Sequence, residues 1–507
     1  MIPLSRLVDR AAALQAGLPA IIDQNGARFS YGELARRAAH IAGALSARGI
    51  APGDRVAILA RNSFRYLEIN LACAYAGIIL VPLNIRLAPA EITRILNLTE
   101  AKLLLQALPH DAGATPVLAW DDAEQPGADT PYEQMIANGP ALERGVEGRP
   151  DDIAQIFFTS GTTGEPKGVC LTQQNLACSA VDSIIAMELG PHDVWFHAPP
   201  MFHLVDAFAI WAISMVGGKH VISHFEPQQF GPMVQAECVT KTSLPPILLD
   251  MIARDPDIGR YDLSSLDRIS YGGAPMPDAM YHRVTDALGC PLVQAYGITE
   301  TSGLVCQQFP RDLLRHGGVR TNSVGQPGLS IELKVIDDDG NAVPPGAVGE
   351  MAVRGPRVMR EYWRSPAATQ AAMPDGWYRT GDLGVADAEG HYAIVGRKKD
   401  MIITGAENVY PTEVENALCN HPAVAEAAVI GIPSARWGEE VRGIVFLNEG
   451  CTVTPDELII HCRGLIGGYK VPKVIEISSE PLPKSGPGKI AKNVLRAPYW
   501  EKVSDIR

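Results

Sequence analysis

Residues 159–168 (Thr-Ser-Gly-Thr-Thr-Gly-Glu-Pro-Lys-Gly) have the composition of a phosphate-binding loop and follow an apolar strand candidate, residues 154–158. The glycines let backbone N–H groups approach phosphate oxygens, the hydroxyls add donors, and Lys167 adds positive charge. The Gly-x-x-x-x-Gly-Lys-Ser/Thr pattern of a Walker A loop is absent from this segment. We therefore expect a polyphosphate here, contacted by Thr159, Ser160, Gly161, Thr162, Thr163, Gly164 and Lys167.

The same string resembles the phosphate loop of the adenylate-forming superfamily, which includes acyl- and aryl-CoA synthetases, adenylation domains of peptide synthetases and beetle luciferases. The resemblance covers nearly the whole chain, because the other family motifs follow in the family's order. It implies an enzyme that activates a carboxylic acid with ATP as an acyl-adenylate and then passes the acyl group to a thiol. The implied cofactors and substrates are ATP, Mg²⁺, coenzyme A and a small-molecule carboxylic acid.

Residues 294–301 resemble the family's second nucleotide segment. The resemblance implies that Tyr296 stacks on adenine, that Thr299 contacts the α-phosphate and that Glu300 helps to hold Mg²⁺. A carboxylate suits a hard cation that bridges phosphate oxygens. Residues 272–275 are similar to the segment whose backbone approaches the adenine and acyl groups. The nucleotide-binding residues implied by both segments are Gly273, Ala274, Pro275, Gln294, Ala295, Tyr296 and Gly297.

Two later segments complete the implied nucleotide site. Residues 378–383 resemble the ribose-binding motif, in which Asp382 accepts hydrogen bonds from both ribose hydroxyls through its two oxygens. Residues 396–403 resemble the interdomain hinge. There Arg397 would contact the ribose or a phosphate, and Lys399 falls at the pivot.

Residues 483–490 resemble the C-terminal catalytic loop of the family, and the resemblance gives Lys489 the catalytic role. Its ammonium would bridge the attacking carboxylate and the α-phosphate. Two anions must meet in this reaction, so a fixed cation offsets their repulsion most at the transition state. Loss of such a contact typically costs about 10²–10³ in rate.

The thiol step is implied to follow a swing of the C-terminal domain that withdraws Lys489 and presents residues 404–411. The sequence departs from the family at Gly405-Ala406, where many relatives have two glycines. Ala406 would cost on the order of 1 kcal/mol if its φ must be positive. Trp437 belongs to a Trp-Gly pair that the family places near the pantetheine channel. The acceptor is therefore expected to be coenzyme A, with a carrier-protein phosphopantetheine as the alternative.

The resemblance also assigns an acyl pocket whose segments are mostly apolar or small. His203 is its only basic side chain and Asp206 its only acidic one. A second carboxylate on the substrate would need an Arg or Lys, so an uncharged hydrophobic monocarboxylate is expected, with a fatty acid favoured over an aromatic acid. His203 is kept as a catalytic-site candidate, either in contact with the substrate or in support. The segments are residues 201–203, 205–212, 271–274 and 302–306.

The elements that must position these residues alternate between helices and short apolar strands. A capping box at residues 30–33 opens a helix to about Ala47, and a strand over 55–60, a helix over 64–75 and a strand over 78–83 follow. Residues 106–146 lack a clear period and are expected to be an irregular connection. This alternation indicates α/β layers with largely parallel strands.

Residues 331–336 and 349–354 alternate in polarity around a turn-rich segment, which predicts a β-hairpin. The predicted fold class is α/β. A large N-terminal domain of layered mixed sheets with helices and a β-rich subdomain is followed by a small, mobile α/β C-terminal domain. The expected boundaries are 1–398 for the N-terminal adenylate-forming domain and 399–507 for the C-terminal lid.

Composition excludes several classes of protein. The chain has 507 residues and a net charge of −13, which disfavours nonspecific binding to nucleic acid or anionic membranes. The nine cysteines show no metal-ligand spacing, and no segment resembles a signal peptide or an integral membrane span. We expect a cytoplasmic protein, leave a homodimer open, and keep a nonadenylating acyl-AMP-binding protein as the rival of another class.

Overall fold

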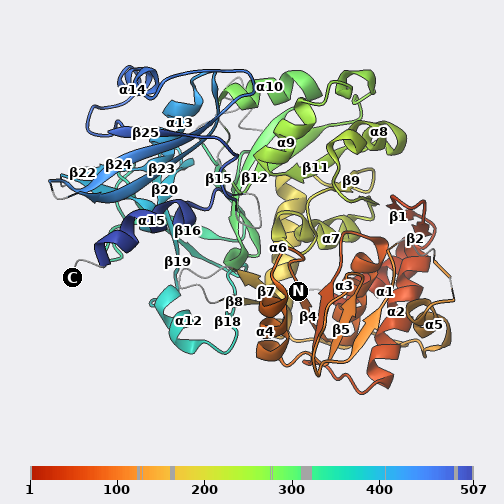
Figure 1. Ribbon diagram of the computed structural model, residues 1–507. Helices are drawn as coiled ribbons and strands as arrows, with labels where there is room; N and C mark the ends of the chain where they lie inside the picture. Colours follow the sequence, from red (N-terminus) through yellow and green to blue (C-terminus); the bar gives the residue numbers. More distant parts are fainter. Residues whose placement is uncertain are drawn as a thin grey trace.

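The computed structural model describes residues 3–122, 126–127, 129–159, 166–274, 276, 278–309, 323–405, 407–434, 436–484 and 489–504, with only the backbone described at 278–279 and 501–504. Four β-sheets with surrounding helices form the molecule (Figure 1). Among the described residues no helix has both the length and the apolar character needed to cross a bilayer.

The seven-stranded sheet confirms the predicted alternation near the N-terminus. Its strands β3 (Arg55–Leu59), β4 (Ile79–Pro82) and β5 (Leu103–Gln106) are parallel, in the order β4-β3-β5. Helices α3 (Phe64–Ala76) and α4 (Pro89–Thr99) make the crossovers. Apolar side chains fill both faces of these strands, which explains their nearly continuous hydrophobic sequence.

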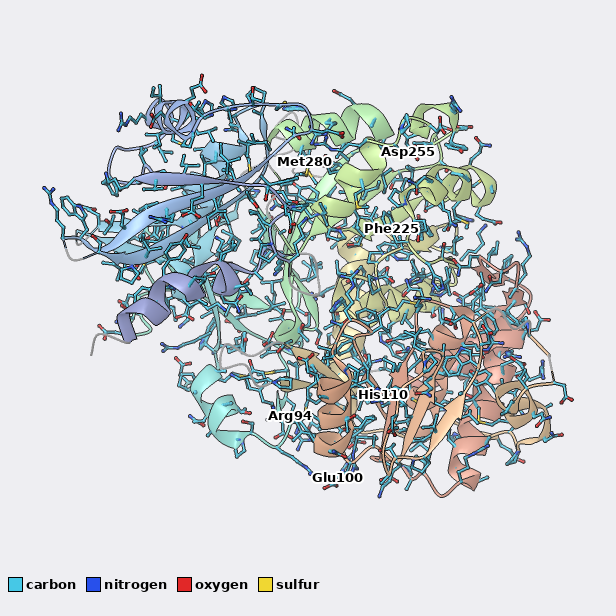
Figure 2. All side chains as sticks on the ribbon, viewed as in Figure 1. Arg94, Glu100, His110, Phe225, Asp255 and Met280 are labelled. Atoms are coloured by element: carbon cyan, nitrogen blue, oxygen red, sulfur yellow. The ribbon has the colours of Figure 1, made fainter. Side chains whose placement is uncertain are left out.

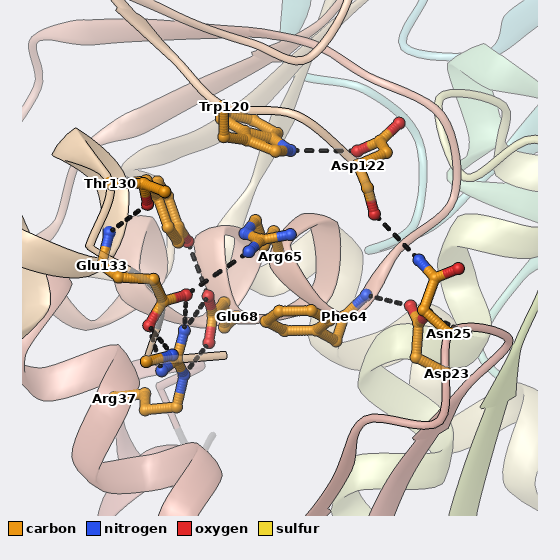
Figure 3. Close-up of polar contacts among 12 residues, drawn as sticks. Asp23, Asn25, Arg37, Phe64, Arg65, Glu68, Trp120, Asp122, Thr130 and Glu133 are labelled. Atoms are coloured by element: carbon orange, nitrogen blue, oxygen red, sulfur yellow. Dashed lines mark hydrogen bonds and ion pairs between the residues drawn. The ribbon is translucent and has the colours of Figure 1, made fainter. Parts of the chain in front are cut away.

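Helix α2 (Tyr31–Ala47) begins at the predicted capping box. The Ser30 hydroxyl accepts from the Glu33 N–H at 3.3 Å, and the Glu33 carboxylate accepts from the Ser30 N–H at 2.8 Å. From α2, Arg37 donates to the buried carboxylates of Glu68 at 2.6 Å and Glu133 at 2.9 Å (Figure 3). These buried charges are paired, so the network fixes how three helices sit against one another.

The prediction of an irregular connection over residues 106–146 is wrong in part. The segment contains β6 (Val117–Ala119) and helix α5 (Pro131–Asn138). The Thr130 hydroxyl caps α5 by accepting from the Glu133 N–H, and the Glu133 carboxylate is held by Arg37. A long-range ion pair thus stabilises a helix that local periodicity does not reveal.

The nine-stranded sheet carries much of the functional region. Strands β9 (Val194–His197), β11 (Lys241–Leu244), β12 (Arg268–Gly272) and β13 (Leu292–Ile298) are parallel neighbours, and β14 (Gly303–Gln307) returns antiparallel to β13. The carboxyl ends of β12 and β13 therefore lie side by side, where α/β sheets usually bind ligands.

The predicted hairpin is confirmed in a four-stranded antiparallel sheet. Strand β16 (Glu332–Ile336) pairs with β17 (Gly349–Arg354), and β17 pairs with β19 (Tyr378–Ala386), which pairs with β20 (Tyr392–Arg397). The register places Asp382 directly opposite Arg397. Two segments that the sequence separates are thereby brought together.

The chain then passes through a short 3₁₀ helix, η3 (Lys398–Asp400), into a five-stranded sheet. Its shorter strands are β21 (Ile402–Thr404), β22 (Glu407–Val409) and β25 (Val474–Ser478). The long strands β23 (Val424–Ser434) and β24 (Gly438–Leu447) pack against helices α13 (Pro411–Cys419) and α14 (Pro455–Arg463) around a separate apolar cluster. Figure 1 shows these elements beside the rest of the molecule, in blue. The domain boundary at 398 and 399 remains a prediction.

Candidate active site

A cavity of about 2180 Å³ lies where the carboxyl ends of β12 and β13 face β19, β20 and the segment that carries Lys489. Met280, which lines it, lies on α10 (Asp278–Leu288) at the border with the C-terminal elements (Figure 2). Most of the predicted site residues line this one space. They are Thr159, Lys167, His203, Gly273, Ala274, Gln294, Ala295, Tyr296, Gly297, Thr299, Glu300, Asp382, Arg397, Lys399 and Lys489.

Asp382 is the centre of a polar cluster in the cavity wall. The Tyr296 hydroxyl donates to its Oδ2 at 2.6 Å, and Arg397 Nε lies 2.6 Å from its Oδ1. Burial raises the pKa of Asp382, while the Arg397 charge and the Tyr296 hydrogen bond act to lower it. Both carboxylate oxygens thus accept from protein donors, which fixes the orientation of the carboxylate.

Glu300 lies on the 3₁₀ turn η2 (Thr299–Thr301), directly after β13. Its Oε1 accepts from the Tyr362 hydroxyl at 3.0 Å, and its backbone carbonyl accepts from the Met359 N–H at 2.7 Å. Lys167 Nζ lies 5.0 Å from the centre of the Tyr362 ring. Tyr362 therefore connects the acidic turn to the end of the phosphate loop.

Lys489 reaches this cluster from the C-terminal elements. Its side chain is accessible from the cavity, yet loss of bulk water in the cleft lowers its pKa, as does the nearby Arg397 charge. The carboxylates of Asp382 and Glu300 act in the opposite direction. The ammonium group therefore shares its surroundings with the carboxylates that the sequence assigned to ribose and metal.

The predicted phosphate loop joins the ends of an antiparallel pair. Strand β7 (Ile153–Thr159) ends where β8 (Lys167–Thr172) begins, and Thr159 pairs with Lys167. Both residues line the cavity, so the loop between them starts and ends at its wall. The other predicted residues of the loop, together with two more, lie outside the described residues: Ser160, Gly161, Thr162, Thr163, Gly164, Pro275 and Ala406.

Glycines keep the backbone near the nucleotide wall accessible. A Cβ on Gly272 would lie 2.4 Å from the Ala295 carbonyl oxygen, so no side chain fits there. Gly273 has φ +83°, a conformation that glycine adopts without strain. Next to them, the Tyr271 hydroxyl donates to Gln294 Oε1 at 3.3 Å and orients that amide.

Gly405 and Trp437 lie together but are not part of the cavity lining. The Gly405 N–H donates to the Trp437 carbonyl at 2.8 Å, and Gly405 has φ +59°. The Trp437 residue is 40% exposed. The structure thus brings Lys489 into the cleft and leaves this glycine–tryptophan pair outside it.

The apolar side of the cavity is formed by Phe202, Leu204, Val205 and Phe208 around His203. Burial, with the Arg86 and Lys489 charges, lowers the pKa of His203 from 6.5 to about 4. The imidazole is therefore neutral at physiological pH and adds no charge to the pocket.

The prediction that Asp206 belongs to the acyl pocket is wrong. Its carboxylate is fully buried, accepts from Trp195 Nε1 at 3.0 Å, and lies 2.6 Å from His197 Nδ1. Asp206 is in the first turn of α7 (Leu204–Val216), and the helix points this side chain away from the cavity. The only acidic residue of that predicted pocket is thus a structural one.

Sequence reasoning missed several cavity residues, notably Tyr362, Ser243 and Ser270. Tyr362 lies on the two-residue strand β18 (Glu361–Tyr362), which pairs with β8. Ser243 and Ser270 lie within β11 and β12. None belongs to a motif, and only the pairing of distant strands places them at the site.

Comparison with known proteins agrees with this geometry. Residues 8–363 match the family described as AMP-binding enzyme, and residues 413–489 match the AMP-binding enzyme C-terminal domain. A feruloyl-CoA synthase from Amycolatopsis sp is 36% identical over 94% of this chain and 95% of its own length. A fatty acid–[acyl-carrier-protein] ligase from Streptomyces coeruleorubidus is 35% identical over 95% and 93%. The crystal structure of ATP-bound MatB from Rhodopseudomonas palustris superposes with TM-score 0.88 at 28% identity, covering 98% of this chain and 99% of that one.

Proposed function

Since the chain belongs to the AMP-binding enzyme family, we propose that Lys489 catalyses acyl-adenylate formation in the large cavity. The enzyme is an AMP-forming acid–thiol ligase that uses ATP, Mg²⁺ and coenzyme A. One observation supports this most directly. A lysine from the C-terminal elements shares the cavity with Asp382, Arg397 and Glu300 from the larger part of the chain.

In the first step a substrate carboxylate oxygen attacks the α-phosphorus of ATP. The new P–O bond forms as the bond to the β-phosphate oxygen breaks, and pyrophosphate leaves with its electron pair. Lys489 offsets the repulsion between the carboxylate and the phosphoryl oxygens, and Thr299 contacts the α-phosphate from the turn after β13. Lys167 and the loop before it hold the outer phosphates.

Asp382 binds the ribose in this proposal, with Arg397 and Tyr296 beside it. Two donors already converge on its oxygens, at 2.6 Å each, so the carboxylate is held rigidly for a pair of hydroxyls. Such prior orientation means that ATP does not have to order the side chain on binding.

Glu300 fits the expected site of Mg²⁺. Its carboxylate lines the cavity beside Thr299, and oxygen donors of this kind are what the ion prefers. The bound ion would neutralise phosphate charge during displacement. The Tyr362 hydroxyl keeps the Glu300 carboxylate oriented through its 3.0 Å hydrogen bond.

The thiol step requires a second arrangement of the C-terminal elements, with Lys399 as the pivot. Lys489 occupies the cleft while Gly405 and Trp437 are outside it, which supports the assignment of the present arrangement to adenylation. A rotation that exchanges them would bring the turn that contains Gly405 to the acyl-adenylate. Coenzyme A is the acceptor, and similarity to a carrier-protein ligase supports an acyl carrier as the alternative.

The substrate is proposed to be a monocarboxylic acid whose remaining part is uncharged and apolar, either a fatty acid or an aromatic acid. The neutral His203 and the side chains of Phe202, Val205 and Phe208 support this class. A second carboxylate on the substrate would lose its hydration in this pocket, at a cost that an apolar wall cannot offset.

Pyrophosphate release should be measured for the wild type and Lys489→Ala with fatty, benzoic and cinnamic acids, without a thiol and then with coenzyme A or a phosphopantetheinyl carrier. We expect acid-dependent release that falls by about 10²–10³ in Lys489→Ala. Lys473→Ala, at an exposed lysine outside the cavity lining, is the matched control.

Release at full rate from Lys489→Ala would contradict the assigned role. If the wild type released no pyrophosphate with any acid but still bound acyl-AMP, the protein would instead be a nonadenylating binding protein.

A further inference from the structure

Two serines lie side by side in the sheet beneath the acyl part of the cavity. Ser243 of β11 pairs in register with Ser270 of β12, so both side chains are on the same face. Both residues line the cavity and are only 5% and 4% exposed. Since Gly272 shares this face two residues further along β12, the serines lie about 7 Å deeper than the backbone at the carboxyl end of the strand.

On the same face of the sheet, the register of β11 and β9 places Ser243 on the side of the buried His197, whose ring is already hydrogen-bonded to Asp206 and His220. Phe208 of α7 and Ile247 of α9 (Pro246–Ala253) line the same cavity. Arg254, the residue that follows α9, also lines the cavity, and its Nε donates to Asp250 Oδ2 at 2.7 Å.

The Ser270 hydroxyl is buried and has no hydrogen-bond partner within the part of the chain that the structure describes. Leaving a buried polar group unpaired is unfavourable, because the group has lost its hydrogen bonds to water. A ligand group that pairs with it would recover this free energy, and a rotation about χ1 is enough to redirect the hydroxyl. The unpaired hydroxyl therefore indicates a bound partner with hydrogen-bonding capacity.

We propose that Ser270, with Ser243 beside it, recognises a hydroxyl group at the far end of an aromatic acid substrate. The inference rests on the proposed function, because it concerns the acid whose carboxylate is activated at Lys489. A serine hydroxyl donates and accepts, and so does a phenol, whereas a carboxylate at this depth would need a cation.

An aromatic ring suits the depth of the serines better than an alkyl chain. It holds its hydroxyl at a fixed distance from the carboxylate without loss of rotamer freedom on binding. The Phe208 ring in the wall offers a partner for stacked or edge contacts. This substrate class differs from the fatty acid that the sequence favours.

The test compares 4-hydroxycinnamate with cinnamate, and 4-hydroxybenzoate with benzoate, by kcat/KM for pyrophosphate release. We expect the wild type to prefer each hydroxylated acid, and Ser270→Ala to reduce that preference by roughly tenfold, the effect of one neutral hydrogen bond. The unsubstituted acids should be used equally well by both enzymes, which shows that Ser270→Ala folds. Ser243→Ala should reduce the preference in the same direction.

Ser183→Ala is the matched control, because the Ser183 hydroxyl is also buried and unpaired among the described residues but lies on α6 (Gln173–Ala186), outside the cavity lining. It should leave the preference unchanged. Equal use of hydroxylated and unsubstituted acids by the wild type, or a preference that survives in both serine variants, would overturn the inference while leaving adenylation intact. Absence of pyrophosphate release with every acid would instead contradict the proposed function itself.

Discussion

At the scale of single residues, the carboxylates of Asp382 and Glu300 in the cavity each accept from a tyrosine hydroxyl that sets their orientation. Asp382 accepts from Tyr296, a residue 86 positions away, and faces Arg397 across a strand pair. Glu300 accepts from Tyr362. The residues that would contact the nucleotide are thus held before it binds, which lowers the ordering cost of binding.

Replacement of Asp382 by Asn should weaken ATP binding. The amide keeps the shape but has one acceptor oxygen, so its NH₂ group would face either the Tyr296 hydroxyl or Arg397, both of which donate to the carboxylate. Loss of a charge-assisted bond costs about 1.5–3 kcal/mol, so the KM for ATP should rise by roughly 10- to 100-fold at saturating acid. Asp339→Asn, at an exposed turn, is the control and should leave the KM for ATP unchanged. An unaltered KM in Asp382→Asn would contradict the ribose assignment.

The pH dependence of adenylation should report the ionisation of Lys489. The cation is the active form, and burial with the Arg397 charge lowers its pKa from 10.5. As pH rises through the lowered pKa the cation is lost, so kcat/KM for the acid should fall at a pH below the usual lysine range. Lys489→Arg keeps its charge at high pH and should shift this fall upward. If kcat/KM fell at the same alkaline pH in Lys489→Arg as in the wild type, the fall would not report the ionisation of Lys489.

At the scale of elements, strand ends and short turns place the site. The functional residues follow β13, lie opposite one another in β19 and β20, or flank the β7–β8 turn. Strands fix the positions of these residues, while the turns leave backbone groups open to the ligand. The element that carries Gly405 is different, because it lies outside the cavity and is required only if the C-terminal elements rotate.

Gly405→Ala should impair thioester formation more than adenylation. Gly405 has φ +59°, and an added Cβ would lie 2.9 Å from Trp437 Cε3. Strain of about 1 kcal/mol together with this contact should displace the turn at Gly405 and slow acyl transfer by roughly tenfold, with pyrophosphate release nearly unchanged. The two rates can be measured separately, with and without coenzyme A. Gly450→Ala has φ +74° but open space around it, so it controls for backbone strain alone.

If Gly405→Ala reduced both rates in proportion, the assignment of the turn at Gly405 to the thiol step would be wrong.

At the scale of the whole molecule, the cavity is built from parts that lie far apart in the sequence. Arg397 ends β20, and the short η3 helix then leads into a sheet with its own apolar cluster. Lys489 enters the cleft from this side, and Trp437 faces away from it. One rotation at Lys399 would exchange the two and would allow a single cavity to serve two reactions in succession.

Trp437 provides a direct measure of this rotation. The residue is 40% exposed, so acrylamide should quench its fluorescence in the free enzyme. Addition of coenzyme A to enzyme that holds a nonhydrolysable acyl-adenylate analogue should reduce the quenching, because Trp437 would move to the channel. The difference between the wild type and Trp437→Phe isolates this residue from the other tryptophans. If coenzyme A did not change the quenching of Trp437 fluorescence, the proposed rotation that exchanges Lys489 and Trp437 would be contradicted.

The sequence by itself determined the order of the motifs, the helix at the Ser30 capping box, the β16–β17 hairpin and the membership of Lys489 and Asp382 in the site. These features depend on short-range patterns or on a family resemblance that local residues carry. Only the tertiary structure decided that Asp206 faces His197, that α5 forms under the Arg37–Glu133 ion pair, and that Ser243 and Ser270 share one floor. The pairing of Ser243 with Ser270 depends on strands from separate segments of the chain and leaves no local pattern. Asp206 is oriented by the packing of α7 against β9, and α5 has a local start signal at Thr130 but is held in place by the distant Arg37.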